Sequence, residues 1–151
     1  MMIGSRTTLV SIAGAVMALA AACGGGSSGP RKVIVTEGIC GGQVAILRMK
    51  LGQTNRVILD NTQHSGDQES ITLNLDRFPV LVQGDVPEGS VIGTRLSTIR
   101  VTSPAGEQKS VDLQPTGTGT YKGTCNVSLH DQTTGERRFI STNVTFQLVE
   151  Q

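Results

Sequence analysis

The segment GTYKGTCNVSLH, residues 119–130, contains the pair of side chains in this chain best suited to metal chemistry. A strand-like stretch ends in Cys125 and then, five residues later, His130. A thiolate and an imidazole are the ligands that soft transition metals such as copper favour. Because side chains alternate along a strand, Tyr121, Gly123 and Cys125 share one face, which directs the sulfur toward a core. The segment therefore predicts either a metal site or a cysteine engaged in another bond.

Motifs for other chemistry are missing from the sequence. No G-x-S-x-G motif stands between a strand and a helix, since the match at residues 25–29 falls in a Gly/Ser-rich stretch. The two histidines, His64 and His130, fall in polar turns with no acidic pair at a useful spacing. Asp67 and Glu69 follow His64, but such a turn is more often solvated than a cation site. The glycine-rich pieces lack a following helix that would bind phosphate. We expect a protein that is not an enzyme.

The N-terminal residues have the layout of an export signal. Arg6 precedes an apolar run from Leu9 to Ala22, and only small residues stand before Cys23. The run is too short and too rich in Ala and Gly to span a membrane comfortably, since that needs about 20 mainly apolar residues. Ala20-Ala21-Ala22-Cys23 resembles the lipobox of bacterial lipoproteins, which implies a signal peptide at residues 1–22 and a lipid on Cys23. Ordinary secretion after cleavage at an A-x-A site is the alternative.

The lipid anchor would be followed by a flexible linker and then one folded domain. Residues 23–30 comprise the lipidated cysteine and GGGSSGP, a Gly/Ser-rich stretch typical of a linker. Gly24 in place of Asp resembles lipoproteins sent to the outer membrane, if the cell has one. Residues 31–151 suffice for a single domain. Their acidic and basic residues balance and aromatic residues are few, so no nucleic-acid partner is expected.

Period-two alternation of apolar and polar residues dominates the domain, as in Leu47–Leu51, Ile71–Leu75 and Val144–Leu148. Further short apolar segments bounded by turn residues are Lys32–Thr36, Arg56–Asp60, Val80–Val82, Leu96–Val101, Ser110–Leu113 and Thr120–Leu129. No window shows a helical stripe. The pattern predicts an all-β sandwich of two antiparallel sheets with Greek-key links.

Two segments resemble the cupredoxins, the small copper β-sandwiches of plastocyanin and azurin type. MKLGQTNRVILDN (Met49–Asn61) is similar to the strand, Gly turn and strand before the first metal ligand of that family. SPAGEQKSVDLQPTGTGTYKGTC (Ser103–Cys125) is similar to its hairpin and ligand-bearing G-x-Y-x-x-x-C strand. The resemblance implies a cupredoxin-like sandwich over residues 31–151.

The same resemblance implies copper ligands, of which some are present and some are not. Cys125 and His130 match the family pattern. Glu69 occupies the place of the first His, and His64 would have to substitute for it. The axial Met is missing, because the turn after His130 offers only Gln132.

In cupredoxins the loop after the first strand reaches the end of the sandwich that carries the ligand loops, which implies that Cys40 lies near Cys125. With Cys23 lipidated these two cysteines are an even pair, and exported proteins usually oxidise such pairs. A bridge closing so long a loop contributes about 4–5 kcal/mol in the chain-entropy model. Because an oxidised Cys125 cannot bind copper, we favour a Cys40–Cys125 disulfide.

We therefore expect an extracytoplasmic lipoprotein, attached to a membrane by its lipid, that acts as a binding or structural module of the cell envelope. It would need no cofactor, and its partner would be another envelope protein or a small ligand at the loop end. The alternative is a copper protein for electron transfer or copper handling that uses Cys125, His130, His64 and Glu69. A sandwich of immunoglobulin type, with the disulfide joining the two sheets mid-strand, is a third hypothesis.

Overall fold

The computed structural model describes residues 29–64 and 66–151. The predicted signal peptide, the lipidated Cys23 and most of the predicted linker lie outside these residues, and their assignments stay predictions.

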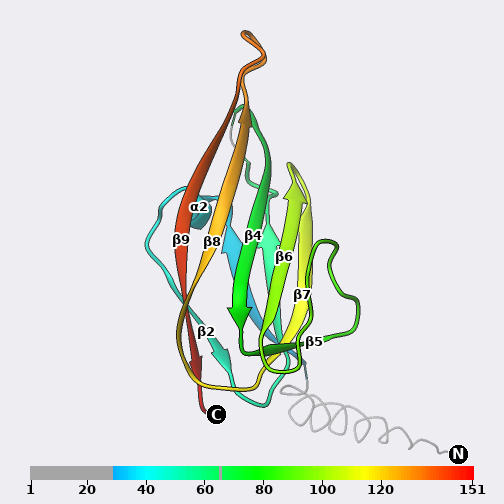
Figure 1. Ribbon diagram of the computed structural model, residues 1–151. Coiled ribbons are helices and arrows are strands. Elements are labelled where there is room, and N and C mark those ends of the chain that lie inside the picture. Colours follow the sequence, from blue (N-terminus) through cyan, green and yellow to red (C-terminus); the bar gives the residue numbers. More distant parts are fainter. Residues whose placement is uncertain (1–28, 65) are drawn as a thin grey trace, which may run out of the picture.

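The described chain is almost entirely β-structure (Figure 1). Its elements, in chain order, are β1 (Arg31–Thr36), α2 (Glu37–Cys40), β2 (Ile46–Lys50), β3 (Asn55–Asp60), β4 (Gln68–Phe78), β5 (Val80–Gln83), β6 (Ser97–Pro104), β7 (Gln108–Pro115), β8 (Gly119–His130) and β9 (Arg137–Val149). The predicted all-β class is confirmed. The helical turn α2 was not predicted, because four residues are too short to show a helical period.

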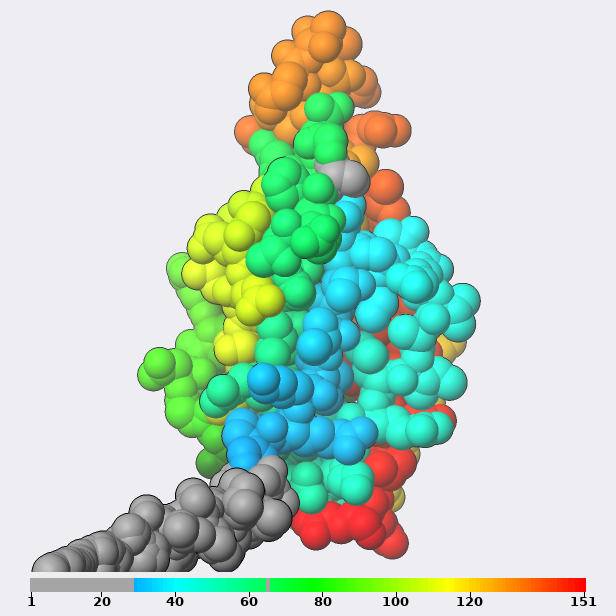
Figure 2. Space-filling model, turned by 180° about the vertical axis from the view of Figure 1, so that it is seen from behind, coloured from blue at the N-terminus to red at the C-terminus, as the bar shows by residue number. Residues whose placement is uncertain are grey.

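The strands form two sheets that pack as a sandwich. Sheet A has the order β1-β3-β7-β5, and sheet B has the order β2-β9-β8-β4-β6. Figure 1 looks onto sheet B, and Figure 2 shows the opposite side, where β1 and β3 of sheet A lie.

The expectation of purely antiparallel sheets is wrong at one edge of each sheet, because β1 runs parallel to β3 and β2 runs parallel to β9. The chain crosses from sheet A to sheet B after β1 and back again before β3, and such crossovers produce parallel neighbours. Alternation in the sequence could not reveal this, since it is the same for both strand directions. Greek-key linkage stays a prediction.

The inward faces of both sheets supply one apolar core. Leu73 and Leu75 of β4 are fully buried, as are Leu113 of β7 and Phe146 of β9. The ring of Phe78 meets Phe146 edge to face, with 5.6 Å between the ring centroids. Such aromatic pairs add about 0.5–1.5 kcal/mol beyond the area they bury. The predicted inward alternation of these strands is confirmed.

The two ends of the molecule differ. At one end, β1 begins at Arg31, whose backbone N–H donates to Thr54 O, and β9 ends at Val149, whose carbonyl O accepts from Leu51 N–H. At the opposite end the β8–β9 hairpin projects beyond the body, as its tip shows in Figures 1 and 2. Within the described residues no helix has the length and apolar character needed to cross a membrane.

Candidate functional site

A disulfide joins Cys40 to Cys125, with 5.0 Å between their Cα atoms. Cys40 ends α2, whose first turn is capped by the side chain of Thr36, and Cys125 lies in the middle of β8 between Leu73 and Thr142. Both sulfurs are fully buried. The predicted pairing is confirmed. Cys125 lies mid-strand in β8, and α2, which directly follows β1, contacts β8 and β9. Because Cys40 lies in α2 and not in a strand, the bridge also differs from the strand-to-strand link expected for a sandwich of immunoglobulin type.

The disulfide removes the sulfur ligand on which the copper hypothesis depended. A metal-binding cysteine must be a thiolate, and Cys125 is oxidised. No group of three or more His, Cys, Asp or Glu side chains in the described part of the chain is arranged to hold a metal ion. His64 lies exposed in the β3–β4 loop. The predicted ligands are therefore not brought together as a set.

Two of the predicted ligands, Glu69 and His130, do meet, and a buried amide pair explains how Glu69 is positioned. Asn61 Nδ2 donates to Gln68 Oε1 at 2.9 Å, and Gln68 Nε2 donates to Asn61 Oδ1 at 2.7 Å. The register between β4 and β8 shifts between Gln68 and Ser70. This bulge lets Gln68 point inward while Glu69 and Ser70 reach the outer side of sheet B, as bulges commonly redirect side chains.

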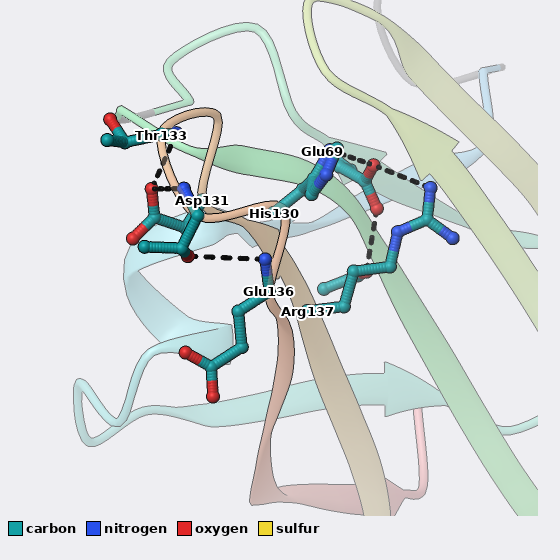
Figure 3. Close-up of polar contacts among 8 residues, drawn as sticks. Glu69, His130, Asp131, Thr133, Glu136 and Arg137 are labelled. Atoms are coloured by element: carbon teal, nitrogen blue, oxygen red, sulfur yellow. Dashed lines mark hydrogen bonds and ion pairs between the residues drawn. The ribbon is translucent and has the colours of Figure 1, made fainter.

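Glu69 is the centre of a polar cluster at the base of the projecting hairpin (Figure 3). Its Oε1 lies 3.3 Å from His130 Nδ1 and 3.6 Å from Arg137 Nη2, and its Oε2 accepts a hydrogen bond from Ser128 Oγ at 3.2 Å. The His130 contact is an ion pair when the imidazole is protonated. The backbone N–H of His130 donates to Asp67 O. Glu69 therefore ties the start of β4 to both strands of the hairpin.

The hairpin turn has its own organising residue, Asp131 (Figure 3). Its Oδ1 accepts from the backbone N–H groups of Thr133 at 2.8 Å and Thr134 at 3.3 Å. These donors favour the ionised carboxylate and hold the pKa of Asp131 below its ordinary value. Glu136 N donates to Thr134 Oγ1 and closes the turn. The turn is thus ordered by its own hydrogen bonds.

Beside this cluster, sheet B carries a groove of about 280 Å³ on its outer face. Four hydroxyl side chains line it: Ser70, Thr72, Thr102 and Ser128. The amide of Asn126, the guanidinium of Arg100 and the ring of Phe139 complete it. Phe139 is 73% exposed, and it is the one aromatic residue among the exposed large hydrophobic residues of the described chain.

Two further grooves have different chemistry. One of about 540 Å³ lies between the loop after β5 and strands β6 and β7, and its lining includes Asp85, Glu88, Arg100 and Lys109. The other, of about 610 Å³, lies by the ion pair of Arg56 and Asp112 on sheet A. Both mix acids and bases, whereas the groove on sheet B has Arg100 as its one charged residue.

Phe139, Asn126 and Arg137 were not predicted from the sequence as members of a surface site. Extending the alternation of Val144–Leu148 backward along β9 would have placed Ser141, Phe139 and Arg137 on the outer face. An aromatic residue at a position predicted to face solvent was the available signal.

No protein-family model and no curated protein matches the chain. Among solved structures, the chain is similar to the ASH / PapD-like domain of human CEP192 (PapD-like domain 7). The identity is 16%, the match covers 72% of this chain and 84% of that one, and the TM-score is 0.30. At that score the similarity assigns no function. The match is a PapD-like domain and not a cupredoxin, so the expected cupredoxin relationship is wrong.

Proposed function

We propose that this protein is an exported lipoprotein whose β-sandwich serves as a non-catalytic binding or structural module of the cell envelope. The observation that carries the proposal is the buried Cys40–Cys125 disulfide. Such bonds persist in oxidising compartments outside the cytoplasm and are rare inside it. With these two cysteines paired, Cys23 is the one remaining cysteine in the sequence, so no other cysteine competes for its thiol, and a lipid acceptor needs such a thiol.

The position of the start of β1 supports a tethered module. This strand begins at Arg31, at the end of the molecule opposite the β8–β9 hairpin (Figure 1). A lipid on Cys23 and the short Gly/Ser linker would therefore hold that end toward the membrane. The Glu69 cluster and the hairpin would point away from it, toward partners in the surrounding envelope. The bound partner would be another envelope component rather than nucleic acid.

The proposal is tested by expressing the full chain in a bacterial host supplied with an alkyne-tagged palmitate. Wild-type protein is expected to take up the label and to partition into detergent, and Cys23→Ser is expected to do neither. The matched control is the double variant Cys40→Ser/Cys125→Ser, which lacks the bridge but keeps the acceptor and should remain labelled. An unlabelled wild type, secreted after cleavage at the A-x-A site, would show that the tether is wrong.

A further inference from the structure

The outer face of sheet B has an uncharged polar centre. Paired positions on neighbouring strands line up there, so that Thr102, Thr72, Asn126 and Ser141 form one row across four strands. The next row comprises Arg100, Asn74, Thr124 and Asn143. Hydroxyl and amide groups thus recur along the strands and across them, with neighbouring strands about 4.8 Å apart. Arg100 is the one charged residue in these two rows, at the edge strand.

The outer face of sheet A shows that this composition is not general to the molecule. Lys32 and Arg56 lie there with Asp60 and Asp112. Arg56 and Asp112 form a bidentate ion pair with nitrogen–oxygen distances of 2.8 and 3.0 Å. Mixed charges of this kind are the ordinary means of keeping a sheet face soluble. The central rows of sheet B use uncharged hydrogen-bonding groups instead, and charged residues such as Lys122 and Arg48 lie in rows beyond them.

Much of the hydrogen-bonding capacity on this face is unused within the protein. Thr72 and Thr102 share a hydrogen bond of 3.0 Å between their hydroxyl oxygens. By contrast, the side chains of Asn126, Ser141 and Asn143 make no hydrogen bond to any other described residue. A ligand can therefore bind these groups without first breaking an internal contact. Each amide offers both a donor and an acceptor.

Phe139 lies beside these rows of polar side chains. It pairs with Ser128 on β8, which in turn pairs with Ser70 on β4, so the ring lies in the same outer row as two hydroxyls of the groove. The side chain is 73% exposed. A single exposed ring is too small for an apolar protein-docking patch. A flat aromatic surface beside many hydroxyl and amide groups matches a ligand that is itself apolar on its ring face and polar at its rim.

Sugar rings have that combination, because their C–H faces stack on aromatic rings while their hydroxyls donate and accept hydrogen bonds. We propose that the outer face of sheet B binds an uncharged polysaccharide, with one sugar ring over Phe139 and the following sugars across the row of Asn126 and Thr72. The row through Asn126 and Thr72 carries no charged residue, which argues against a polyanion, because a polyanion would need a basic stripe. This inference rests on the proposed envelope function, since the envelope is where such polymers would be met.

The test titrates the purified full-length protein with cellohexaose, chitohexaose, maltohexaose and mannohexaose in a calorimeter. At least one of these neutral glycans should bind, with an affinity that is nearly the same at about 0.1 and 1 M salt, because no ion pair would contribute. Phe139→Ala and Asn126→Ala should each weaken binding about tenfold, as is typical for central contacts. Both residues face solvent, so the thermal unfolding midpoint of these variants should stay near that of the wild type.

Ile34→Ala and Gln114→Ala on the outer face of sheet A are the matched controls, and they should bind as the wild type does. Failure of all these glycans to bind overturns the proposal. So does binding confined to heparin and abolished by salt, or to peptides in place of glycans, or an unchanged affinity in Phe139→Ala. These outcomes can be distinguished from those of the lipidation test. Glycan binding by a chain that acquires no lipid would refute the proposed anchoring alone. A lipid-labelled chain that does not bind glycans would refute this inference alone.

Discussion

The side chains of Glu69 and His130 show how a chemical pattern can be recognised and its role misjudged. Both were predicted as metal ligands, and both do lie in one cluster. The cluster is completed by Arg137, which brings a cation toward the carboxylate and not a further metal ligand. The partners come from β4, β8 and the start of β9, so no local spacing in the sequence announces them. Residue type indicated polar chemistry, and only the assembled strands showed that these side chains form a polar network around Glu69.

Asp112 offers a prediction about pH at the same scale. Hydrogen bonding by Arg56 and then its charge lower the pKa of this carboxyl below its ordinary value. The pair therefore stabilises the fold fully above the unfolded pKa of about 3.9, and the contribution is lost as the pH falls through the lowered folded value. Asp112→Asn is expected to reduce the free energy of unfolding by up to about 1 kcal/mol at neutral pH, because the pair is partly exposed.

The measurement is urea unfolding of both proteins across a series of pH values. The difference between them should shrink to nothing in strong acid, and Asp85→Asn in the exposed loop after β5 serves as the control. A difference that persisted unchanged at low pH would mean that Asp112 acts through something other than its charge.

Among the elements, β8 links the core to the outer surface. Its alternate residues Tyr121, Gly123 and Cys125 were predicted to share the inward face, and Gly123 and Cys125 are buried there. The predicted strand Thr120–Leu129 matches β8 closely. The first part of β9, before Val144, was not predicted, because it pairs only with β8 and its residues do not alternate between apolar and polar. Partner strands, not the intrinsic preference of the residues, set the length of this hairpin.

Gly123 provides the prediction for this element. A Cβ added there would lie 2.8 Å from Leu75 Cδ2 and 3.1 Å from Asn74 O, so neighbouring atoms would have to move. Gly123→Ala should therefore lower the free energy of unfolding by about 1–3 kcal/mol, as overpacking typically does. Gly117→Ala is the matched control, because its added Cβ would meet Pro79 at an ordinary 3.7 Å. Chemical denaturation compares them, and equal stability of the two variants would contradict the packing argument.

For the whole molecule the disulfide is the main long-range restraint, since Cys40 and Cys125 are 85 residues apart. It fastens the crossover between the sheets, through α2, to the middle of sheet B. Cys40→Ala/Cys125→Ala should unfold with about 4–5 kcal/mol less free energy than the oxidised wild type. Reductant should bring the wild type close to the variant and leave the variant unaffected in urea titrations. A variant as stable as the oxidised protein would show that the crossover needs no covalent restraint.

The sequence by itself determined the all-β class, the approximate positions of most strands and which residues of each strand face the core. These follow from period-two alternation, which is a local property of the chain. Tertiary structure alone decided the parallel edges of both sheets, the mid-strand position of the bridge, the Glu69 cluster and the polar face around Phe139. Those features depend on which strands become neighbours, and alternation specifies the face of a side chain but not the strand beside it.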